Sequence, residues 1–336
     1  MKQLIDVYLY SILVFLLMGV NHAQAFYNAG SALGTNTNEL TPEDTSLPFV
    51  DLFKMSPPFE ENRRWSHFTR GNIKYDAFGW PTRLNNGQVG TRFLGKIPKA
   101  ALPEGFYTVI YDGEGFITYG NDASIHSRQH GKDIIFLTAG HDNIYNATLF
   151  IKEINEQNPI RNIRILMPGG ICASNPFRRV DKAHECARSD FRSFEKYSDS
   201  IIFNPDYLNF MKDFKVIRFM NMSGITRNAI QHWHQRNTLR SATWGGKEGT
   251  RGAPIEIMIA LANKLNADPW FSMPHAASDE YIYQFAAYVR DHLRPNLKIY
   301  IEYTNETWNT VFDQAFYVRE IGKELGFGND EMVAGQ

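Results

Sequence analysis

The sequence predicts an α/β protein in which helices join parallel strands and an antiparallel β module is inserted. Two observations predict this fold class. After residue 201, short apolar runs alternate with amphipathic helical patterns, which is typical of βα units around a parallel sheet. Between residues 65 and 200, several short β-like runs follow one another without helices, which is typical of an antiparallel sandwich.

The βα units begin at Asn204, a favourable N-cap residue, and Pro205 takes the first helical position. The expected elements in order are a helix from Asn204, a strand over 215–220, a helix from Pro254, a strand over 270–273, a helix over 282–293, a strand over 297–303 and a helix from Trp308. Such a series predicts either an open doubly wound sheet or a closed (β/α)8 barrel.

Functional groups gather at the carboxyl ends of the strands in both architectures. The expected strands are followed by Asn221, by His275 and by the pair Asn305-Glu306. No Gly-rich phosphate loop follows the first strand, and no cofactor is predicted.

The inserted module is expected over 65–200, with short strands at 106–111, 115–119, 133–138, 147–151 and 160–167. The run Asp112-Gly113-Glu114-Gly115 predicts a hairpin turn between the first two. The module either binds carbohydrate or shields one flank of the parallel sheet. The lack of an evident aromatic strip favours shielding.

A connection of 32 residues, 221–252, follows the strand over 215–220 and is far longer than usual between a strand and a helix. It contains Trp233 and Trp244, which argue against disorder. Two interpretations remain open. The connection forms a wall of a binding cleft, or its aromatic residues pack over the end of the sheet.

The N-terminus has the features of a signal peptide over 1–25. Lys2 precedes an apolar run over 4–20, and Ala23-Gln24-Ala25 supplies the small residues that signal peptidase reads. An uncleaved membrane anchor is the alternative, but Asp6 interrupts the run and favours cleavage. We therefore expect a secreted or extracytoplasmic protein that leaves the membrane once the signal is removed.

The only two cysteines, Cys172 and Cys186, are predicted to form a disulfide in this export context. No metal site is predicted, because only His184 lies near them and the pair His232 and His234 is too sparse. The 35 basic residues balance the 36 acidic ones without a basic block, which argues against nucleic acid as a partner. Aromatic residues make up 14% of the chain, and they suit either a packed core or sugar stacking.

The most informative stretch is Tyr300 to Thr307, which delivers an Asn-Glu pair to the end of a strand. With a period of two, Glu302, Thr304 and Glu306 point to one side. In a barrel this side can be the inner wall, where a carboxylic acid is placed for proton transfer. The alternative is an exposed Glu at a strand end with no chemical role.

These residues resemble those of a clan of retaining glycoside hydrolases built on (β/α)8 barrels, in which the fourth strand ends in Asn-Glu. The resemblance covers Gly34 to Asn38 and about residues 205 to 336, and Tyr303 and Thr307 depart from the usual pattern. The run Asp268-Pro269-Trp270-Phe271 and the Glu-Tyr-x-Asn-Glu-x-Trp segment also resemble exported bacterial proteins often labelled cellulose-binding or hypothetical. The resemblance implies a partial TIM-type barrel, its first four βα units, formed by residues 26–64 plus 201–336.

The resemblance also implies roles for single residues. Glu306 would be the acid/base, Asn305 would bond the sugar 2-hydroxyl, and Arg218 would orient the nucleophile. His275 would line the sugar subsite, and Trp308, Trp233 and Trp244 are further candidates for contact with a polysaccharide or oligosaccharide. Glu302 is expected to form a buried ion pair with Arg218 and to take no part in the chemistry.

A retaining mechanism needs a second carboxylate about 5 to 5.5 Å from the first. In the clan that nucleophile lies on the seventh strand, so the chain is expected to be a fragment without hydrolytic activity, and Met332 to Gln336 to open a fifth strand. The first hypothesis is therefore a secreted retaining glycoside hydrolase whose full-length form is active. The alternatives are a non-catalytic carbohydrate-binding protein, of the cellulose-binding kind, and a structural envelope protein.

Overall fold

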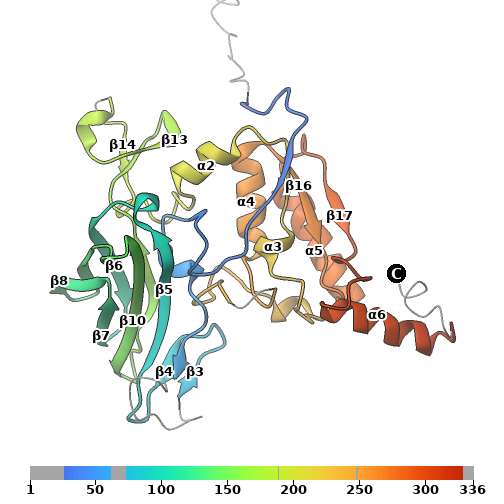
Figure 1. The fold of residues 1–336 in the computed structure, drawn as a ribbon, viewed down its shortest axis with the longest axis horizontal. Coiled ribbons are helices and arrows are strands. Elements are labelled where there is room, and N and C mark those ends of the chain that lie inside the picture. The colour runs from blue at the N-terminus through green and yellow to red at the C-terminus, as the bar shows by residue number, and fades with distance from the viewer. Residues whose placement is uncertain (1–25, 62–72, 188, 247–248, 328–336) are drawn as a thin grey trace, which may run out of the picture.

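A computed structural model of the chain describes residues 26–61, 73–187, 189–246 and 249–327. The fold is mixed α/β, with a small parallel sheet, its helices and several antiparallel sheets (Figure 1). The α/β class is thus confirmed, and within the described ranges the parallel sheet does not close into a barrel. The predicted signal peptide and the predicted fifth strand lie outside the described residues.

The parallel sheet consists of β1 (Gly34–Asn36), β15 (Val216–Arg218), β16 (Asp268–Ser272) and β17 (Tyr300–Glu302). Each strand pairs in parallel with the next one along the chain, so the order in the sheet is the order in the sequence. Strands β15 and β17 are shorter than predicted, whereas β16 begins two residues earlier and ends one residue earlier than predicted. Their carboxyl ends nevertheless lie side by side, as the sequence requires for a shared site.

Helices connect the strands at the predicted places: α2 (Pro205–Met211), α4 (Ile255–Leu265), α5 (Asp279–His292) and α6 (Asp313–Glu324), with the short α3 (Met220–Ser223) after β15. Asn204 caps α2 as predicted, since its side chain accepts a hydrogen bond from the Asp206 amide. Ser278 caps α5 in the same way.

The last helix begins at Asp313, five residues later than predicted. The side-chain oxygen of Asn309 accepts a hydrogen bond from the Val311 amide, and this local bond competes with helix formation. Trp308 and Val311 therefore precede the helix, and they are 64% and 62% exposed.

The inserted region forms two four-stranded antiparallel sheets. One has the order β2 (Glu60–Glu61), β5 (Val89–Pro98), β10 (Ile144–Ile154), β7 (Gly115–Asn121), and the other β11 (Arg161–Leu166), β6 (Gly105–Asp112), β9 (Lys132–Leu137), β8 (Ala123–Gln129). Alternate side chains, such as Tyr107, Ile135 and Leu149, are fully buried. Strand β2 pairs with β5, so the antiparallel region begins before residue 65.

The predicted hairpin at 112–115 is wrong. Strand β6 pairs with β9 and β11, whereas β7 pairs with β10, so the turn joins two different sheets. The amide of Glu114 donates to Asn158 and its carbonyl accepts from Asn155, which ties the turn to another loop. A Cβ on Gly113 would lie 2.2 Å from the Pro159 carbonyl oxygen, so glycine permits this close approach.

The antiparallel region and the parallel sheet share one continuous core, and the segment around residues 50–56 joins them. The buried carboxylate of Asp51 accepts hydrogen bonds from the amides of Phe53 and of Ile165 in β11. Lys54 donates to the Ser241 carbonyl oxygen in the long connection. Gly245 lies so close to Met55 that a Cβ there would meet the Met55 carbonyl oxygen at 1.9 Å.

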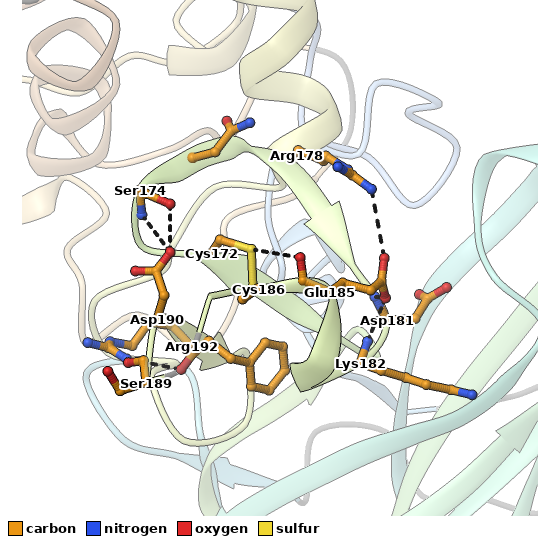
Figure 2. The surroundings of a disulfide bond; sticks show 12 residues. Cys172, Ser174, Arg178, Asp181, Lys182, Glu185, Cys186, Ser189, Asp190 and Arg192 are labelled. Carbon is orange, nitrogen blue, oxygen red and sulfur yellow. Dashed lines mark hydrogen bonds and ion pairs between the residues drawn. A yellow bond between two sulfur atoms is a disulfide. The ribbon is translucent and has the colours of Figure 1, made fainter.

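Two small sheets complete the fold: β3 (Lys74–Tyr75) with β4 (Pro81–Arg83), and β13 (Asn175–Val180), β12 (Gly170–Cys172), β14 (Phe191–Ser193). The predicted disulfide between Cys172 and Cys186 is confirmed in the second one (Figure 2). Asp190 accepts two hydrogen bonds from Ser174 beside it.

Among the described residues, no helix has both the length and the apolar character needed to cross a membrane.

The disulfide is expected to stabilise the small sheet. Removing it in a Cys172→Ser, Cys186→Ser variant should lower the free energy of unfolding by about 2 to 3 kcal/mol, because the bridge restricts a short loop of the unfolded chain. Urea unfolding followed by circular dichroism measures this, with Ser189→Ala, just after Cys186, as a control outside the closed loop. An unchanged midpoint would contradict the expectation.

Candidate functional site

Polar side chains collect at the carboxyl ends of β15, β16 and β17. Arg218, Ser272 and Glu302 are the last residues of these three strands. The register sets Arg218 opposite Trp270 and Ser272 opposite Glu302. Thr304, Asn305 and Glu306 follow directly in the loop between β17 and α6 (Figure 1).

The carboxylate of Glu302 accepts hydrogen bonds from three side chains. Arg218 donates from Nε to Oε2 at 3.0 Å and from Nη2 to Oε1 at 2.8 Å and Oε2 at 2.7 Å. The indole of Trp270 donates at 3.0 Å and the hydroxyl of Ser272 at 3.1 Å. The predicted ion pair is confirmed, and so many donors leave this carboxylate little capacity for a reaction.

Arg218 connects this ion pair to the Asn-Glu motif. Its Nη2 also donates to Oδ1 of Asn305 at 3.0 Å, and its guanidinium lies over the Trp270 ring, 5.6 Å from the centroid. Asn305 is 1% exposed, and Gln314 of α6 donates to its backbone carbonyl. Among the described residues, Nδ2 of Asn305 has no hydrogen-bond partner, so the motif retains one spare donor.

Glu306 lies next to this fixed asparagine in a tight turn and is partly exposed. Its φ of 43° lies in the left-handed region, which costs a non-glycine residue about 1 kcal/mol or more. Asn309 holds the turn, since its amide donates to the Glu306 carbonyl and its Nδ2 donates to Oε2 of Glu306 at 2.8 Å. Trp308 projects into solvent between the two.

His275, after β16, belongs to the same end of the sheet. It is 4% exposed, and its carbonyl accepts a hydrogen bond from the Tyr303 hydroxyl at 2.8 Å. Burial lowers the pKa of the imidazole, an effect that the carboxylate of Asp313 partly opposes. Its Nδ1 has no partner among the described residues, so the site contains a neutral, unpaired imidazole near pH 7.

The two tryptophans of the long connection lie elsewhere. Trp244 is 3% exposed and packs in the core against Phe49, with Lys54 over its ring. Trp233 is half-buried between Arg236 and Tyr281. Neither ring joins the strand-end residues, and the burial of Trp244 leaves it no face for a ligand, so the structure favours aromatic packing for this connection.

One face of the parallel sheet forms an open depression of about 380 Å³, lined by Gly34, Thr35, Asn36, Val216, Arg218, Trp270 and Tyr300. The rings of Trp270 and Tyr300 stack across neighbouring strands with centroids 5.8 Å apart. Sequence reasoning did not assign these two residues, Ser272 or Asn309 to the site. Alternation along β16 places Trp270 on the same face as Ser272, which is the signal that would find them.

Among the described residues, no group of three or more His, Cys, Asp or Glu side chains is arranged to hold a metal ion. Comparisons of the chain with protein family models, with curated proteins and with solved structures found no match.

The buried imidazole of His275 should make stability depend on pH. Because the pKa of this histidine is lower in the folded chain than in the unfolded chain, the unfolded state binds more protons below about pH 6.5. The free energy of unfolding should therefore fall as the pH drops from about 7 to 5, and less so in His275→Gln. Urea unfolding across this range measures it, with the exposed His130→Gln as control; identical slopes for the wild type and His275→Gln would refute it.

Proposed function

We propose that this chain is part of a secreted retaining glycoside hydrolase that acts on a polysaccharide, with Glu306 as the acid/base. The observation that carries the proposal is the Asn305-Glu306 pair. Arg218 and Gln314 hold the asparagine, and the glutamate beside it occupies an exposed turn at the carboxyl end of a parallel strand.

The sheet supports the barrel part of the proposal. Its four strands are parallel and follow the chain order without the reversal that a doubly wound sheet contains. A partial TIM-type barrel of four βα units would have this strand order. In such a barrel the face bearing Arg218, Trp270 and Glu302 would be the inner wall.

In the proposed reaction, the protonated carboxyl of Glu306 donates its proton to the glycosidic oxygen while a nucleophilic carboxylate attacks the anomeric carbon. The bond to the leaving sugar breaks and a glycosyl-enzyme forms. Glu306, now ionised, then accepts a proton from the water that releases the second sugar. The bond from Asn309 to Oε2 leaves Oε1 of Glu306 available for this proton transfer.

The nucleophile has no candidate among the residues at the described site. Glu302 is the nearest carboxylate along the strand, but Arg218, Trp270 and Ser272 all donate to it. Four of the five hydrogen bonds go to Oε2, and the ion pair with Arg218 makes Glu302 a poorer nucleophile than an unpaired carboxylate. The proposal therefore requires a carboxylate that the described residues do not supply at this site.

The exposed ring of Trp308 would bind the sugar, whereas Asn305 and His275 are buried and would position the residues around it. An indole face next to the acid/base suits stacking on a sugar ring, because its apolar surface matches the C–H face of a pyranose. Trp233 and Trp244 take no part in this account.

A non-catalytic carbohydrate-binding protein is the second candidate. The rings of Trp270 and Tyr300 favour it, since they stack on one another, are partly exposed and line the open depression. Such a protein would be retained on insoluble glucan without releasing reducing sugar. The export features and the disulfide agree with either candidate.

Replacing Glu306 by Gln in the gene's complete product tests the assignment. The rate of polysaccharide hydrolysis should fall at least about 1,000-fold, because the leaving sugar is a poor leaving group unless its oxygen is protonated. Hydrolysis of a dinitrophenyl glycoside should fall much less in its first step, since that leaving group departs unprotonated. Added azide should restore turnover and yield a glycosyl azide of retained configuration.

The exposed Glu324→Gln in α6 is the matched control and should behave as the wild type. Unchanged polysaccharide hydrolysis by Glu306→Gln would sink the role of Glu306. Binding to insoluble glucan by a wild-type product that never hydrolyses it would favour the second candidate.

A further inference from the structure

A second cavity lies under the long connection 221–252, between this connection and helices α4 and α5. Its volume is about 240 Å³, several times the roughly 30 Å³ that one water molecule occupies. Phe219 and Ser272 line it at the strand ends, Phe285 lines it from α5, and Arg236 and Arg251 line it from the connection. It shares no lining residue with the open depression.

Arg251 is a cation in this cavity without a counter-charge among the described residues. Its Nη2 donates to the carbonyl oxygen of Thr243 at 2.8 Å, and its Nε is buried without a partner. Glu39 also reaches this connection, but it accepts a hydrogen bond from the Gly249 amide and forms no ion pair with Arg251. Burial lowers the pKa of the guanidinium, and no neighbouring carboxylate opposes that effect.

Arg236 adds a second donor but no net charge. It forms a mostly buried ion pair with Glu256 at 2.9 Å, while its Nε is buried and unpartnered like that of Arg251. The cavity thus contains one arginine, Arg251, whose charge no carboxylate among the described residues offsets.

We propose that this cavity binds a small oxyanion, a carboxylate or phosphate group, with Arg251 as its charge partner. A partly buried cation without a counter-charge is unfavourable, and an anion in the adjoining space removes that penalty. The guanidinium of Arg251 supplies N–H donors of the kind that oxyanions accept. The proposal does not depend on glycoside hydrolysis.

The bound anion would lie beside Ser272, which also donates to Glu302. The cavity therefore adjoins the strand-end network through a single side chain. An anionic group of a substrate or of the surrounding medium would enter it from beneath the long connection.

Thermal unfolding of the chain with sodium phosphate or sodium acetate, at constant ionic strength set with sodium chloride, tests this proposal. The wild-type midpoint should rise and saturate with at least one of the two anions. A response to phosphate identifies a phosphate group as the ligand, and a response to acetate identifies a carboxylate. Arg251→Met should weaken the apparent affinity at least tenfold. Without added anion, the midpoint of Arg251→Met should be no lower than that of the wild type. A lower midpoint is expected if Arg251 only stabilises the fold.

Arg290→Met, at an exposed arginine of α5, is the matched control and should keep the full response. A rise without saturation that is equal in the wild type and Arg251→Met would be a general salt effect and would overturn the proposal. A second result would also overturn the proposal: the wild type shows no rise of the midpoint with either anion, and the rise occurs only in Glu248→Gln. Glu248 lies outside the described residues, and this result would make it the counter-charge of Arg251. If Arg251→Met does not fold, the wild-type titration with Arg251→Lys decides by the same criteria.

Discussion

The carboxylate of Glu302 is the constraint on which the parallel sheet and its site depend. It accepts hydrogen bonds from Arg218, Trp270 and Ser272, so it ties together the ends of β15, β16 and β17. These strands pair over only a few residues, and the ladder bonds alone define their register weakly. The ion pair is mostly buried, with the side chains of Arg218 and Glu302 20% and 22% exposed, so solvent screens it only in part.

The same interaction explains why the Asn-Glu motif has a fixed geometry. Arg218 uses one nitrogen for both Glu302 and Asn305, and this places the asparagine before the turn that carries Glu306. Two neighbouring glutamates thereby acquire different properties. Glu302 is surrounded by donors and is structural, whereas Glu306 has one side-chain donor, Asn309, and remains partly exposed.

The helix cap, the helical segments and the disulfide could be predicted because residues close together in the sequence determine them. Asn204 before Pro205, the helical periodicity and the two cysteines each act over a few residues, and all three predictions are confirmed. The errors arose where distant residues decide the outcome. Asp112 to Gly115 has hairpin chemistry, but packing against residues 155–159 turns the chain into another sheet.

The candidate site was predictable in part for the same reason. The β-like pattern before Asn305 and Glu306 predicts their position at the end of a strand. The resemblance predicts the ion pair of Glu302 with Arg218. The donors Trp270 and Ser272 come from a strand 30 residues earlier, and only the register brings them to Glu302. The burial of Trp244 was not predictable from local sequence, because it depends on Phe49 and Lys54, far away in the sequence.

A double-mutant cycle tests the central role of the Glu302 network most directly, with Arg218→Met, Glu302→Leu and the double variant compared by urea unfolding. A coupling free energy above about 1 kcal/mol is expected for a mostly buried, bidentate pair. Additive effects, within about 0.3 kcal/mol, would contradict the account.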